Sequence, residues 1–165
     1  MKTIIKILIL SGIVLSMAFS CEKEDIPEWS NFVEGYIVGS FICDETDGEN
    51  GQATGNNTER GFCILLKDSE NANENLPMDL YTFDIPIDLF DFPDEILTPN
   101  HNSDNGGPNF FPDSLQNKYK LSFKYAKQIE SVKVHFVCFA FAMMSPFPWE
   151  KYDQVTLRNT NLINE

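Results

Sequence analysis

The chain has 165 residues, 42% of them hydrophobic, and its 25 acidic residues against 12 basic ones give a formal net charge of −13. A charge of this sign repels phosphate backbones, so the composition excludes nucleic acid as a partner. The length suffices for one domain with a core of its own.

The first twenty residues have the pattern of a secretory leader. Two lysines precede an apolar stretch at 7–19, and small residues flank Phe19 just before Cys21. An apolar region of about 7–15 residues after a basic start is typical of a signal peptide, whereas a spanning helix needs about 20 apolar residues. We expect residues 1–20 to be a signal peptide. Its removal takes away two lysines and leaves a net charge of 10 − 25 = −15.

Cys21 stands where cleavage is expected, and the acidic run EKED follows it at 22–25. This arrangement resembles the lipidated cysteine and export signal of surface lipoproteins from Bacteroidota-type bacteria. The resemblance implies a diacylglyceryl thioether on Cys21, an acyl chain on its amine and stable membrane anchoring. It also implies an outer-membrane location facing the cell exterior, with the periplasmic face as the alternative. An ordinary signal peptide, in which Cys21 is a bystander, is the competing interpretation.

After a lipidated polar tether at 21–32, strand patterns dominate residues 33–160, which we expect to form one β domain. Gly35 and Gly39 lie inside the first strand and favour a bend there. The clearest alternation is at 119–125, where every second residue is apolar. Predicted strands cover 33–43, 61–67, 79–85, 119–125, 132–141 and 152–158, with polar loops at 44–58, 68–77 and 98–109.

Apolar and acidic residues are interleaved from 87 to 97. Pro86 suits a first helical position and Pro93 prevents a long helix, so we expect one short helical turn here. The carboxylates are expected to face solvent. The apolar side chains are expected to cover one end of the domain, namely Ile87, Leu89, Phe90, Phe92, Ile96 and Leu97.

Six strands without a long helix predict an all-β fold. The order of elements is a long bent strand, a hairpin into a second strand, a third strand, a short helical insert and closing strands. This order resembles the oligonucleotide/oligosaccharide-binding (OB) fold, and it implies a small OB-like barrel of five to six strands with short helical inserts. An immunoglobulin-like β-sandwich is the alternative.

The remaining cysteines, Cys43, Cys63 and Cys138, lie in apolar strand-like runs. Buried free cysteine behaves as a small hydrophobe, and we expect that role here. Export permits a disulfide, and if two of the three pair, Cys43 with Cys63 is the simplest combination, across a hairpin.

Nothing in the sequence marks a catalytic or metal site. The two histidines, His101 and His135, are far apart in the chain, and the acidic loop at 44–51 departs from the spacing of a calcium loop. No nucleophile motif accompanies either histidine. We therefore expect no enzyme activity, no cofactor and no metal.

Four aromatic residues stand in loop-like contexts: Phe110, Phe111, Phe147 and Trp149. Exposed aromatic rings bind glycans or protein partners, whereas buried ones would cap the core. The tripeptide Asp113-Ser114-Leu115 resembles the O-glycosylation acceptor of Bacteroidota secreted proteins, which makes Ser114 a candidate modification site on an exposed turn.

The sequence thus predicts a non-enzymatic envelope lipoprotein that binds glycan or protein at the cell surface. A structural or accessory subunit of an outer-membrane complex is the alternative, and a small hydrolase is the third interpretation. The first requires loop aromatics on one exposed patch, and the second a large flat apolar surface. The third requires His101 beside a carboxylate and a hydroxyl.

Overall fold

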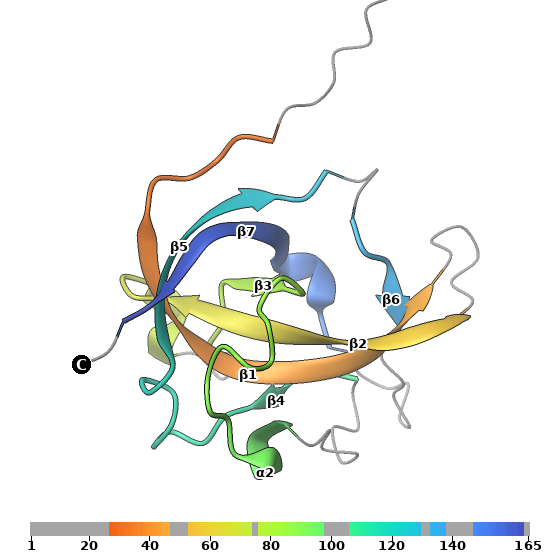
Figure 1. Cartoon of the computed structure of the whole chain (residues 1–165), viewed down its shortest axis with the longest axis horizontal. Helices are drawn as coiled ribbons and strands as arrows, with labels where there is room; N and C mark the ends of the chain where they lie inside the picture. Colours follow the sequence, from red (N-terminus) through yellow and green to blue (C-terminus); the bar gives the residue numbers. More distant parts are fainter. Residues whose placement is uncertain are drawn as a thin grey trace, which may run out of the picture.

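The computed structural model describes residues 27–46, 53–73, 76–97, 106–129, 133–137 and 147–163. These ranges hold strands, one helical turn and two short 3-10 turns (Figure 1). The strands are β1 (Val33–Thr46), β2 (Ala53–Leu66), β3 (Leu80–Thr82), β4 (Asn109–Phe110), β5 (Lys120–Lys127), β6 (Phe136–Val137) and β7 (Asp153–Leu162). The turns are α2 (Asp94–Leu97), η2 (Glu70–Asn73) and η3 (Trp149–Lys151).

Five strands close into a barrel in the order β1-β2-β3-β7-β5 and back to β1. All neighbours are antiparallel except β3 and β7, which run parallel. The insert that contains α2 lies between β3 and β5 in the chain. This arrangement confirms the all-β prediction and the small OB-like barrel, and it rules out the immunoglobulin-like sandwich.

The barrel interior is filled from all five strands. The strands contribute the buried side chains of Ile37, Phe62, Ile64, Leu80, Leu121, Phe123, Val155 and Leu157. Phe92 and Ile96, from the insert and its helical turn α2, are buried against the same cluster. The predicted cover of the barrel end is therefore present. Ile87 does not take part, because 53% of its surface is exposed.

The β1–β2 hairpin is longer than the sequence pattern indicated. Its register runs from Gly35 opposite Leu66 to Thr46 opposite Ala53, with irregularities on the way. The stretch at 44–58 was predicted to be a loop because it is polar and rich in glycine. Antiparallel pairing uses backbone N–H and C=O groups, which polar residues also carry, and this polar segment continues the ladder of the hairpin. The two-residue β4 begins at Asn109, the last residue of the loop predicted at 98–109, and pairs with Gly39 and Ser40.

A second apolar cluster covers the outer face of β1, β2 and β3. Phe41, Leu65 and Tyr81 belong to it, and Phe147 from the segment before η3 packs against them. All three residues of β3 are buried, because β3 has the barrel interior on one side and this second cluster on the other. We call it the outer core, and its buried members are Val38, Phe41, Cys63, Leu65, Met78, Tyr81 and Phe147.

The hairpin register separates the two cysteines that were considered for a disulfide. Cys63 lies opposite Gly39, whereas Cys43 lies opposite Glu59. Cys63 is a free thiol buried in the outer core. The suggested Cys43–Cys63 pair is therefore wrong, and the role of small hydrophobe is confirmed for Cys63. Cys138 lies outside the described residues.

Candidate functional site

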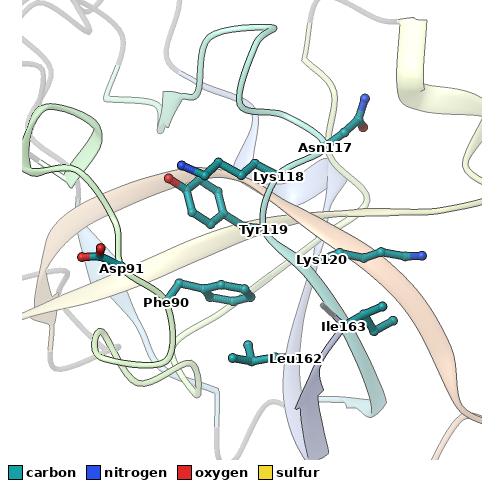
Figure 2. A pocket seen from close by; sticks show the side chains of 8 residues that line it. All are labelled: Phe90, Asp91, Asn117, Lys118, Tyr119, Lys120, Leu162 and Ile163. Atoms are coloured by element: carbon teal, nitrogen blue, oxygen red, sulfur yellow. The ribbon is translucent and has the colours of Figure 1, made fainter. Parts of the chain in front are cut away.

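A groove of about 460 Å³ lies where the start of β5 and the end of β7 meet the insert (Figure 2). Its volume falls in the range of about 300–1,000 Å³ typical of small-molecule sites. Three segments that are distant in the sequence form it. The lining residues are Phe90, Asp91, Asn117, Lys118, Tyr119, Lys120, Leu162 and Ile163.

Local backbone bonds position the groove residues. A turn before β5 is closed by two bonds, from Leu115 N–H to the Pro112 carbonyl (2.7 Å) and from Lys118 N–H to the Leu115 carbonyl (3.1 Å). This turn places Asn117 and Lys118 immediately before Tyr119. The chain after β7 is held by a bond of 3.1 Å from Ile163 N–H to the Lys120 carbonyl. The groove is therefore built on the barrel itself rather than on an isolated loop.

Aromatic rings form one side of the groove. The half-buried Phe90 ring lies 5.5 Å from the Tyr119 ring and 5.3 Å from the Phe92 ring, measured between centroids. Figure 2 shows the Phe90 and Tyr119 rings next to each other, with Asp91 on one side and Lys120 on the other. Tyr119 is 2% exposed, and its buried hydroxyl has no hydrogen-bond partner. This hydroxyl is a buried polar group that an ordered water would satisfy.

The two lysines of the groove differ in electrostatic environment. Lys120 Nζ lies 3.0 Å from Glu34 Oε2, and Lys67 Nζ contacts the same oxygen at 3.0 Å. Hydrogen bonds from Lys67 and Lys120 lower the pKa of the Glu34 carboxyl, and the bond to Glu34 raises the pKa of Lys67. Lys118 Nζ lies 5.4 Å from the Tyr119 ring centroid, and it has no ion pair within the described part of the chain. Lys118 is thus the ammonium that remains available.

The groove therefore offers four kinds of contact to a ligand. Phe90 presents an aromatic ring, Asn117 an amide, Lys118 an ammonium and Asp91 an exposed carboxylate. The ion-pair triad of Glu34, Lys67 and Lys120 adds one net positive charge beside it. Together with Lys118 and Asp91, this gives the site a surplus of one positive charge. An apolar surface with a few placed polar groups is the usual composition of a binding site.

The four loop aromatics predicted to bind a ligand do not form one exposed patch. Phe111 is 2% exposed and belongs to the barrel core, and Phe147 is 5% exposed in the outer core. Neither ring has a free face. Trp149 and Phe110 are half-buried against the outer core. The Trp149 ring lies 4.6 Å from Phe41 and 4.7 Å from Phe147, and its indole N–H donates to the Gly106 carbonyl at 3.2 Å. These aromatics cap the two cores instead.

The other singled-out residues are placed as follows. Ser114 is exposed on the turn before β5, as a modification site requires. His135 is half-buried just before β6. Cys21 and His101 lie outside the described residues. The described ranges contain no group of three or more His, Cys, Asp or Glu side chains that could hold a metal ion.

Sequence reasoning did not find the groove, because its residues come together only through the barrel closure. Phe90 was assigned to the cover of the barrel end, and Lys120 is one of the polar positions in the alternating strand predicted at 119–125. Lys118 and Asn117 carry no motif. One feature of the sequence could have pointed to the groove. Lys118, Lys120 and Lys124 lie close together in or beside the strand at 119–125, although the chain as a whole is acidic.

None of the helices in the described ranges is long and apolar enough to cross a membrane. Comparison of the chain with protein-family models, with curated proteins and with solved structures found no match.

Proposed function

We propose that this protein is a non-enzymatic, lipid-anchored protein of the cell envelope that binds a glycan in the groove of Figure 2. The observation that carries the proposal is the composition of that groove. The half-buried ring of Phe90 offers a face for the apolar side of a sugar. The Asn117 amide and the Asp91 carboxylate offer a donor and an acceptor for sugar hydroxyls, within a hollow of about 460 Å³.

The charge of the site favours an acidic sugar, such as a uronic acid. Lys118 is without an ion pair in the described ranges, and a carboxylate on the ligand would form a charge-assisted hydrogen bond with it. Such bonds are worth roughly 1.5–3 kcal/mol, more than a neutral hydroxyl contact provides.

The accessory-subunit alternative requires a large flat apolar surface. Among the described residues, the exposed large hydrophobic side chains are Phe32, Ile87 and Leu162, which come from three separate segments. Leu162 lines the groove itself. The described surface therefore favours a groove binder over a protein that docks through an apolar face.

A glycan array with neutral and uronic-acid-bearing oligosaccharides tests this proposal. We expect the protein to retain acidic oligosaccharides, and Lys118→Gln to weaken that binding about ten-fold, as expected for the loss of one charge-assisted hydrogen bond. Lys151→Gln is the matched control, because Lys151 is an exposed lysine in η3, outside the groove.

Phe90→Leu tests the stacking face, because leucine keeps apolar volume at the position but removes the ring. We expect this variant to lose affinity for neutral and acidic sugars alike. Phe110→Leu, at a half-buried aromatic outside the groove, should bind as the unmodified protein does. Absence of binding to every glycan, or equal binding by Lys118→Gln and Lys151→Gln, would contradict the proposal.

A further inference from the structure

The residues just before β1 pack on the barrel. Ser30 N–H donates to the Tyr125 carbonyl at 2.8 Å, and Tyr125 N–H donates to the Ser30 hydroxyl at 3.0 Å. These bonds continue the β1–β5 pairing, in which Val33 lies opposite Phe123. The segment at 27–32 thus leaves the barrel at a fixed place on its β5 side (Figure 1).

Two aromatic rings of this segment cover two cations on the barrel. The Arg158 guanidinium lies 4.0 Å from the Trp29 ring centroid, and Lys124 Nζ lies 5.0 Å from that of Phe32. Lys124 and Arg158 are direct cross-strand neighbours on β5 and β7. Like charges in that position repel, and cation–π contacts with the two rings offset the repulsion. We call Trp29, Phe32, Lys124 and Arg158 the tether strip.

The tether strip lies in the most basic part of an acidic protein. Of the ten basic residues that follow position 21, five lie in or just before β5 or in β7, namely Lys118, Lys120, Lys124, Lys127 and Arg158. Two of them are paired, Lys120 with Glu34 (3.0 Å) and Lys127 with Asp153 (2.6 Å). Lys118, Lys124 and Arg158 form no ion pair with another residue that the structure describes. Phe32, at 55% exposure, presents an apolar ring beside Lys124.

The chain between Cys21 and the barrel is short. Six residue steps separate Cys21 from Pro27, which span at most roughly 20 Å when fully extended. A compact domain of this size has a diameter of roughly 35 Å by the usual scaling of radius with chain length. A lipid on Cys21 would therefore hold the β5 side close to the membrane, and the opposite side could not reach it.

We infer that the tether strip rests on the phospholipid headgroups of the membrane to which Cys21 is anchored, and so fixes the orientation of the barrel. The inference rests on the proposed lipid anchor. Aromatic rings and basic side chains together are the usual residues of the membrane interface, where the rings enter the headgroup layer and the cations contact phosphates. The acidic run at 22–25 weakens the purely electrostatic attraction, so the rings contribute as well as the charges.

The two tryptophans make a direct test feasible, because Trp29 belongs to the tether strip and Trp149 to the outer core. The protein is expressed with its leader, so that any lipid is attached during export, and is then reconstituted into phosphatidylcholine vesicles, with and without phosphatidylglycerol, that carry brominated acyl chains. Bromine quenches tryptophans that enter the interface. Subtracting the fluorescence of Trp29→Phe from that of the unmodified protein isolates Trp29. We expect Trp29 to be quenched at least three-fold more than Trp149.

Lys124→Gln combined with Arg158→Gln should reduce the quenching of Trp29 by half or more. Lys151→Gln is again the control. Equal quenching of both tryptophans in protein that sediments with the vesicles would overturn this inference and leave the anchor intact. Failure to sediment with vesicles would overturn the anchor of the proposed function, and the orientation with it. Circular dichroism of each variant verifies that the barrel is folded.

Discussion

Gly61 has less room for a side chain than Gly35 or Gly39. A methyl group built there would meet Cε1 of the Phe41 ring at 2.6 Å, well inside van der Waals contact. Phe41 is fixed by its own neighbours, with ring centroids 5.4 Å from Phe83 and 6.0 Å from Tyr81. The absence of a side chain at Gly61 therefore makes room for the ring that organises the outer core.

We predict that Gly61→Ala lowers the free energy of unfolding by about 1–3 kcal/mol, the usual cost of overpacking a core. Urea unfolding followed by circular dichroism measures it. Phe41→Leu in the same chain provides the control, because the smaller side chain should relieve the clash and make the two effects less than additive. Full additivity of the two substitutions would show that the ring is not the cause.

Cys63 carries a buried thiol whose reactivity can be measured. Its thiol is 0% exposed, and burial raises its pKa above the ordinary range. Because the thiolate is the reactive species, we predict that Cys63 resists maleimide in the folded protein even at pH 9, and reacts promptly in denaturant. Peptide mapping by mass spectrometry reads out Cys63 separately from the other cysteines. Labelling of native Cys63 at pH 7 would contradict the burial.

The 3-10 turn η3 and the residue Phe147 before it pack against the outer core. Trp149 contacts Phe41, Tyr81, Phe136 and Phe147 through its ring. Removing a large aromatic side chain from a core costs roughly 3–5 kcal/mol. We predict that Trp149→Ala lowers the thermal midpoint by 10 °C or more, whereas Phe32→Ala, at an exposed ring, changes it by less than about 3 °C. An unchanged midpoint for Trp149→Ala would return Trp149 to the candidate binding residues.

The elements with regular side-chain alternation were the predictable ones. Residues 119–125 and 152–158 were expected as strands, and the structure has β5 and β7 there, with Leu121, Phe123 and Val155 buried as the pattern requires. The polar arm of the β1–β2 hairpin and the two-residue β4 were missed, since their pairing depends on backbone contacts that side chains do not signal. The sequence pattern therefore predicted the strands that bury apolar side chains, and it missed the strand segments that do not.

For the whole molecule, the barrel topology could be predicted and the site could not. The order of elements led to an OB-like barrel, in which ligands usually bind over the face of strands 2 and 3. Here the outer core covers that face with Phe147 and Trp149. The groove lies instead at the meeting of β5, β7 and the insert. Phe90 and Lys118, 28 positions apart, become neighbours of one hollow only after closure of the barrel.

The proposed glycan site and the tether strip both use β5. The tether strip begins at Lys124, and the groove ends at Lys120 on the same strand. The proposed anchor and the proposed ligand would therefore be held by one rigid element of the barrel. Binding would take place close to the membrane, within reach of envelope glycans.

The central claim, that the groove is the binding site, is tested most directly by a nuclear magnetic resonance titration of the isotope-labelled protein with the acidic oligosaccharide best retained on the array. If the groove binds the glycan, amide shift changes occur at Asn117, Lys118, Lys120 and Ile163, and none beyond noise at 149–152. Shift changes confined to 149–152 and the outer face of β3, with the groove amides unmoved, would contradict it.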